Sequence, residues 1–128
     1  MPSTRYVWLV CGVAVLLLDT FGSLAARRWG FAYESLRPIS FLLYFCAGVG
    51  AGRLAGVWAG GMAGGVTALI DATLGWAISS GVGATRSTGL TTLTLAVVAL
   101  AVVFTGWVLG LIGGAIGKAV HRSVAADA

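Results

Sequence analysis

The stretch AGVGAGRLAGVWAGGMAGGV, residues 47–66, carries the dipeptide Ala-Gly five times, once every four residues. Glycine at this spacing removes side chains from one side of a helix, so that the backbone of a second helix can come very close. In lipid this close approach is a main source of attraction between helices, because the hydrophobic effect does not draw apolar helices together there. The stretch therefore predicts a bundle of tightly packed membrane helices.

The composition of the whole chain also indicates a membrane protein. Of the 128 residues, 59% are hydrophobic and 9% are charged, whereas an average soluble domain has about 25% charged residues. We therefore expect one transmembrane domain, residues 1–128, whose surroundings are the lipid bilayer. The net charge of +4 does not indicate a nucleic-acid partner, because the basic residues are scattered and flank apolar segments, as charges at a membrane surface do.

Four apolar segments are long enough for a helix that crosses the bilayer, which takes about 20 residues. The expected spans are residues 6–26, 39–58, 62–80 and 90–117. We place the reversal between the second and third spans at Gly60-Gly61, because a reversal at Arg53 would leave a second span of only 14 residues. The tryptophans then gather at the two membrane interfaces, where this residue is enriched, with Trp8 and Trp58 at one and Trp29 and Trp76 at the other.

Glycines recur at helical spacing in three of these spans, and we expect them to mark the faces on which helices pack. The residues are Gly48, Gly52 and Gly56 on the second span, Gly64 on the third, and Gly106, Gly110 and Gly114 on the fourth. Patterns of small residues four apart serve packing within one subunit, a seam between subunits of an oligomer, or the lining of a pore. Packing within one subunit is the simplest interpretation, and a homo-oligomer is the main alternative.

The ends and connections of the spans leave several questions open. The first span has a small-x-small sequence at Ser23-Leu24-Ala25, as a cleaved signal peptide would, but Asp19 and the length of the span favour a retained helix. Residues 27–38 are an ordinary connection or a stretch lying on the membrane surface, with Pro38 opening the second helix. Residues 81–89 are expected to form a loop. Basic residues divide evenly between the two sides, so the positive-inside rule assigns no orientation.

Three ionisable residues lie within the spans: Asp19, Arg53 and Asp71. Such charges are costly in lipid and usually face the interior of the bundle or water. Arg53 and Asp71 fall on neighbouring spans, so we expect them to form a buried ion pair that fixes the register of the two helices. The alternative is that Asp71 lines a path for an ion, a proton or a substrate. Asp19 lies nearer a membrane face, where it can reach the interface or pair with Arg27 or Arg28.

Other chemistry finds little support in the sequence. His121 is the only histidine and shares no ligand spacing with Cys11 or Cys46, so no metal site is predicted. No serine or cysteine has a plausible neighbouring base for nucleophilic catalysis. The glycine-rich repeat lacks the Lys-Ser/Thr ending of a phosphate-binding loop. We therefore expect no cofactor, and the sequence does not indicate an enzyme.

The sequence thus predicts an all-α, polytopic integral membrane protein with four helices. Arginine outnumbers lysine seven to one, a bias typical of GC-rich genomes, and we expect the cytoplasmic (inner) membrane of a bacterium. Two functions remain open. The first is a non-catalytic membrane or assembly component, working alone or with other membrane subunits. The second is a small channel or transporter that uses Asp71, and with it Asp19.

Overall fold

The computed structural model describes residues 4–83 and 91–126, and within these two ranges every regular element is helical. The prediction of an all-α protein is therefore confirmed. Two of the elements are short: η1 is a single 3₁₀ turn and η2 a π-helical turn. The elements are α1 (Thr4–Trp29), η1 (Tyr33–Leu36), α2 (Arg37–Ala55), α3 (Val57–Ile70), η2 (Asp71–Gly75), α4 (Trp76–Val82) and α5 (Thr92–Ala126).

The short elements are continuous with the helices beside them. η1 leads directly into α2, and α3, η2 and α4 follow one another without a break. Across the described part of the chain, four helices are consequently long and apolar enough to cross a membrane, which agrees with the number of spans predicted. They are Arg5–Trp29, Tyr33–Ala55, Val57–Val82 and Thr92–Ser123.

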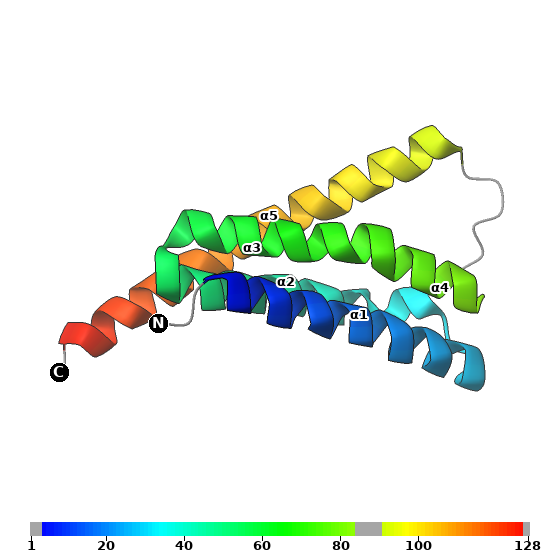
Figure 1. Cartoon of the computed structure of the whole chain (residues 1–128), viewed down its shortest axis with the longest axis horizontal. Helices are drawn as coiled ribbons and strands as arrows, with labels where there is room; N and C mark the ends of the chain where they lie inside the picture. The colour runs from blue at the N-terminus through cyan, green and yellow to red at the C-terminus, as the bar shows by residue number, and fades with distance from the viewer. Residues whose placement is uncertain (1–3, 84–90, 127–128) are drawn as a thin grey trace.

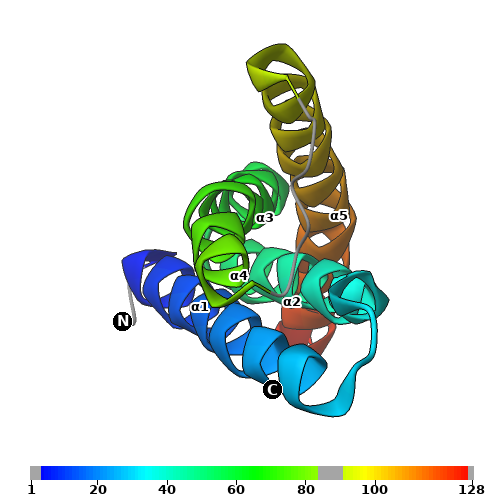
Figure 2. The same ribbon diagram turned by 90° about the vertical axis from the view of Figure 1, so that its right-hand side faces the viewer.

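The four long helices alternate in direction, so that α1 begins and α5 ends at the same end of the bundle (Figure 1). α2 and α3 form a central hairpin, with α1 packed on one side of it and α5 on the other (Figure 2). The second half of α5 lies against the hairpin, whereas its first half diverges from α4 in both views. Side chains on this first half are accordingly exposed, and Leu100 has an exposed fraction of 69%.

The hairpin reverses at Gly56, and the prediction of a reversal at Gly60-Gly61 is wrong. The N–H of Gly56 donates the last helical hydrogen bond of α2, to the Gly52 carbonyl at 3.0 Å. The φ of Gly56 is +91°, and this backbone conformation ends the helix. Glycine takes a positive φ without the steric penalty that a side chain brings. α3 therefore starts at Val57, about one helical turn earlier than expected, and Gly56 belongs to the turn rather than to a packing face.

The start of α2 agrees with the sequence, because Pro38 stands in its first turn. Proline suits this position, where its missing N–H would have no helical partner. Of residues 27–38, the first three end α1, residues 33–36 form η1 and the last two begin α2, so they do not form one uninterrupted surface segment. Residues 84–89 of the expected loop, and the expected start of the last span at residue 90, lie outside the described residues.

Glycines of α2, α3 and α5 meet at what we call the glycine junction. A Cβ atom added to Gly48 would lie 2.6 Å from the Cα of Gly110, and one added to Gly64 would lie 2.7 Å from the same atom. Real Cβ atoms essentially never come within 3.0 Å of a heavy atom from another part of the structure. The three backbones therefore lie too close for any side chain to stand between them. The junction consists of Gly48, Gly52, Gly60, Gly64, Gly106, Gly110 and Gly114.

Little side-chain volume fills the rest of this region. The buried apolar cluster nearest the hairpin turn consists of Ala47, Ala51 and Ala63. The sequence assigned Gly56 to a packing face, but a Cβ added to Gly56 would have no atom within 4 Å. Gly60 lies in the junction instead, since a Cβ added there would lie 2.6 Å from the Cα of Gly114. The contact between α2, α3 and α5 is consequently closest at backbone and small residues, while Trp107 and Leu111 of α5 pack over Gly61 of α3.

Replacing Gly52 with alanine tests the junction. A Cβ at Gly52 would overlap the Cα and the carbonyl oxygen of Gly114, so the helices must move apart. We expect Gly52→Ala to lower the free energy of unfolding by about 1–3 kcal/mol, measured by reversible denaturation in mixed micelles. Gly81→Ala is the matched control, since a Cβ there meets nothing within 4 Å and alanine favours helix. Equal losses in the two variants would contradict the close contact.

Candidate functional site

The carboxyl groups of Asp19 and Asp71 meet inside the bundle beside Gly75. A Cβ added to Gly75 would overlap the Oδ2 atom of Asp19 and lie 3.0 Å from the Oδ1 atom of Asp71. Asp19, in the middle of α1, has an exposed fraction of 0%. Because Gly75 has no side chain, these two carboxyl groups come within hydrogen-bonding reach of each other. We call Asp19 and Asp71 the carboxyl pair.

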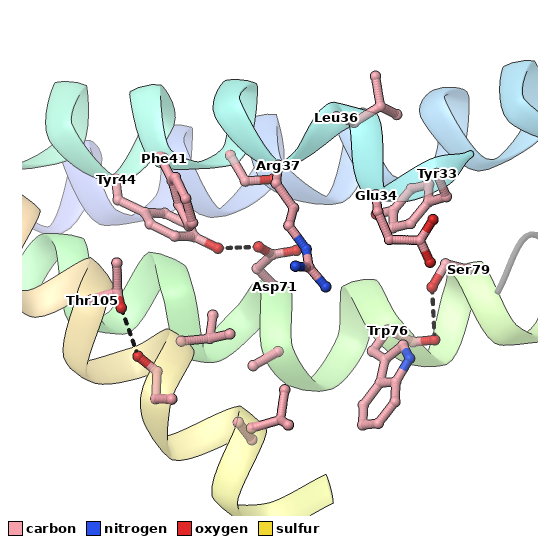
Figure 3. Close-up of a pocket in the computed structure, with 16 residues that line it drawn as sticks. Tyr33, Glu34, Leu36, Arg37, Phe41, Tyr44, Asp71, Trp76, Ser79 and Thr105 are labelled. Carbon is pink, nitrogen blue, oxygen red and sulfur yellow. Dashed lines mark hydrogen bonds between the residues drawn. The ribbon is translucent and has the colours of Figure 1, made fainter. Parts of the chain in front are cut away.

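A tyrosine donates to each member of the carboxyl pair. The Tyr33 hydroxyl donates to Oδ1 of Asp19, and the Tyr44 hydroxyl donates to Oδ2 of Asp71. Figure 3 shows the second of these bonds, with Tyr44 reaching from α2 to η2. Tyr44 is fully buried. Tyr33 is the first residue of η1. Four elements, α1, η1, α2 and η2, thus place one polar group each at the same point.

The polar site also contains buried atoms without partners. Oδ2 of Asp19 and Oγ of Ser23 are both buried and make no hydrogen bond. Within residues 4–83 and 91–126, no basic side chain forms an ion pair with either carboxyl group. Leaving a buried polar atom unpaired costs about 1–3 kcal/mol, and more for a charged group. A proton on Oδ2 of Asp19 would remove this cost, because it could be donated to Oδ1 of Asp71.

The π-helical turn η2 sets the direction of Asp71. In this turn the Trp76 N–H donates to the Asp71 carbonyl, five residues back. A π-helical turn holds one more residue than an α-helical turn, and such turns occur frequently at functional sites. The wider turn keeps Asp71 and Gly75 together on the side that faces α1 and α2. The hydroxyl group of Thr73, in the middle of the turn, donates a hydrogen bond to the Leu69 carbonyl at 2.7 Å.

A cavity of about 480 Å³ adjoins the carboxyl pair, which is within the range of about 300–1,000 Å³ for ligand sites. Asp71 and the fully buried Tyr44 lie at its inner end. Glu34 and Arg37, which are both exposed, also line the cavity. α5 supplies the apolar wall opposite α2, with Val98, Ala99, Ala101 and Val102.

The predicted ion pair between Arg53 and Asp71 is wrong. Arg53 lies in the last turn of α2 and is exposed, while Asp71 bonds to Tyr44. The reason is the position of the reversal: α3 begins at Val57, and its 14 residues carry the chain about 21 Å before Asp71 is reached. Arg53 therefore stays at the hairpin end of the bundle, far from the carboxyl pair.

The prediction for Asp19 is also wrong. The sequence placed Asp19 near a membrane face, with Arg27 or Arg28 as its partner, whereas the structure buries it against Tyr33 and Asp71. Arg27 instead donates to the carbonyl of Val82 at 3.2 Å. α1 continues to Trp29, so Asp19 lies more than two helical turns before the end of its helix and its side chain does not reach the basic residues there.

The sequence did not single out Tyr33, Tyr44 or Gly75. One signal could have found Tyr44. It lies 12 residues before Gly56, and Asp71 lies 15 residues after it, so a hairpin that turns at Gly56 places the two at similar depth. No comparable signal exists for Tyr33 and Gly75, whose roles depend on the approach of α1.

Comparison with known proteins does not assign the site. No protein-family model, no curated protein and no solved structure is significantly similar to the chain. In the described part of the chain, no group of three histidine, cysteine or carboxylate residues is arranged to hold a metal ion. The carboxyl pair and its cavity must therefore be interpreted from their own chemistry.

A double-mutant cycle tests the contact between Gly75 and Asp19. Gly75→Ala should lower the free energy of unfolding by about 1–3 kcal/mol, because the new methyl group occupies the place of the Asp19 carboxyl. In an Asp19→Ala background the same change should cost at least about 0.5 kcal/mol less, since the space is then free. Chemical denaturation of all four proteins in micelles measures the difference. Additive effects would show that the two residues do not touch.

Proposed function

We propose that the chain is a small integral membrane transport protein in which the carboxyl pair binds a proton and couples it to the movement of a solute. Intramembrane carboxyl groups are costly and mark proton, ion or substrate paths in membrane proteins. In this chain two of them meet inside a bundle of four apolar helices. This role needs no enzymatic step.

The observation that carries the proposal is the unpartnered Oδ2 of Asp19 beside Asp71. Two ionised carboxylates in contact, without a cation, would leave two like charges in a medium that solvates neither. One proton held between Oδ2 of Asp19 and Oδ1 of Asp71 halves this charge and gives both atoms a partner. The hydroxyl groups of Tyr33 and Tyr44 then stabilise the remaining charge.

The cavity gives a solute access to the bound proton. Asp71 belongs both to the carboxyl pair and to the cavity lining. A solute that contacts Asp71 therefore changes the free energy of the proton beside it, which is the thermodynamic condition for coupling two ligands. Asp19 lies behind Asp71, and the bond from Tyr33 holds its carboxyl group in place.

The membrane we propose is the cytoplasmic (inner) membrane of a bacterium, on the basis of four apolar helices and the arginine-rich composition. In lipid the glycine junction provides the close backbone contact by which apolar helices associate. The surrounding bilayer covers the exposed apolar side chains of α1 and α5. A homo-oligomer would cover part of the same surface.

A second candidate is a non-catalytic membrane or assembly component. The glycine faces and the exposed first half of α5 favour it, because both suit contact with another helix. The exposed apolar residues of this half of α5 include Leu93, Val97 and Leu100. Under this alternative the carboxyl pair holds its proton permanently and serves only the structure.

Proton movement in proteoliposomes separates the two candidates. Small cationic, neutral and anionic solutes are added outside vesicles that contain a pH-sensitive dye. We expect one class of solute to move protons through the wild-type protein, and no class to do so through Asp19→Asn or Asp71→Asn, because the amides cannot hold the shared proton. Arg53→Gln is the control, since it removes a charge that is exposed and distant from the pair.

A wild-type protein that moves no protons with any solute would overturn the proposal and favour the assembly component. Proton movement that survives in both asparagine variants would overturn the assignment of the carboxyl pair. Size-exclusion profiles of each variant show whether a loss of transport is a loss of fold.

A further inference from the structure

We infer that the cavity binds an amphipathic organic cation, a molecule with one positive group and an apolar or aromatic body. This inference rests on the proposed function and names the class of solute that the carboxyl pair would exchange with protons. It depends on three features of the lining: the charge at the inner end, the aromatic rings, and the apolar wall supplied by α5.

The charge of the inner end calls for a single positive group. When the carboxyl pair holds one proton, one negative charge remains on it. The two other charged residues of the lining, Glu34 and Arg37, are exposed and have opposite signs, so together they add no net charge to the cavity. A monovalent cation beside Asp71 therefore neutralises the inner end, whereas a neutral or anionic ligand leaves its charge uncompensated.

Aromatic side chains line the cavity in which such a cation would bind. Phe41 and Tyr44 line the cavity from α2, with ring centroids 6.0 Å apart, and Trp76 lines it from α4 (Figure 3). Aromatic faces attract cations, and tryptophan does so most strongly. Binding of quaternary ammonium groups by cages of aromatic residues is a common use of this interaction.

The wall opposite the rings favours an apolar body on the same molecule. Val98, Ala101 and Val102 of α5 line this side and offer no hydrogen bond. The first half of α5 diverges from α4 (Figures 1 and 2) and exposes Val97 and Leu100. An amphipathic compound dissolved in the bilayer can therefore approach the cavity along the apolar surface of α5.

Benzyltrimethylammonium is a suitable probe, because it combines a quaternary ammonium group with one aromatic ring. Isothermal titration of the full-length protein in detergent should show saturable binding of this cation. Neutral benzyl alcohol and anionic benzenesulfonate keep the ring and change the charge, and neither should bind. Asp71→Asn should weaken binding about tenfold or more, since it removes the charge that the ligand neutralises.

Two further variants keep the test decisive if Asp71→Asn folds poorly. Trp76→Leu should weaken cation binding about 2- to 30-fold through loss of the cation–π contact. Trp58→Leu is the matched control, because Trp58 packs edge-on against Trp107 and is not part of the cavity lining. Arg37→Gln should strengthen binding, since it removes a like charge from the cavity lining.

The outcomes of this test differ from those of the proton measurement. Absence of saturable cation binding to the wild-type protein would overturn the inference, as would equal effects of Trp76→Leu and Trp58→Leu. Binding of benzenesulfonate that Arg37→Gln abolishes would assign the cavity to anions and overturn it too. If the cation binds but moves no protons in vesicles, the inference holds and the transport function fails. If another class of solute moves protons, the transport function holds and the inference fails.

Discussion

The close approach of three helix backbones at the glycine junction determines the shape of the whole bundle. Where glycines face one another, α2, α3 and α5 touch through backbone atoms. The glycines of the junction end at Gly48 in α2, at Gly64 in α3 and at Gly106 in α5, and beyond these points larger side chains such as Tyr44 and Val102 stand between the helices. The first half of α5 diverges from α4 beyond this point (Figure 1), and residues of this half line one side of the cavity. The position of the cavity is therefore a consequence of where the glycines stop.

The same need for space recurs on the other side of the cavity, where α1 approaches η2. Gly75 leaves room for the carboxyl of Asp19, and the wider π-helical turn keeps Asp71 on the same side. The hydroxyl groups of Tyr33 and Tyr44 each donate a hydrogen bond to this pair. Two acids without a basic partner are an expensive arrangement in an apolar bundle. Such an arrangement is more useful for binding a proton than for stabilising a fold, in which a buried group of opposite charge would serve better.

The number of helices could be predicted from the sequence, because it depends on composition and on the length of apolar segments. The reversal could not be located as well, since length and tryptophan positions define a turn only to within a few residues, whereas the backbone of Gly56 decides it. That error of about one turn led to the wrong pairing of Arg53 with Asp71 instead of Tyr44 with Asp71. Asp19 was recognised as an intramembrane charge but not as a neighbour of Asp71. The rotation of α1 about its own axis depends on its contacts with α2, α3, α4 and η2, and no pattern within α1 indicates it.

Charge balance connects the two proposals. With one proton, the carboxyl pair carries one negative charge, which is costly to retain deep in a membrane. This charge can be neutralised by a second proton on Asp71 or by a monovalent cation beside Asp71, and the two occupy the same place. Replacement of the cation by a proton leaves the net charge of the inner end unchanged at zero, while the proton on Asp19 stays bound throughout. Exchange of one cation for one proton therefore avoids the charged state, whereas a neutral solute would leave the pair charged at one stage of the cycle. This difference in cost is the physical reason that a site built from two carboxyl groups and aromatic rings favours a monovalent cation.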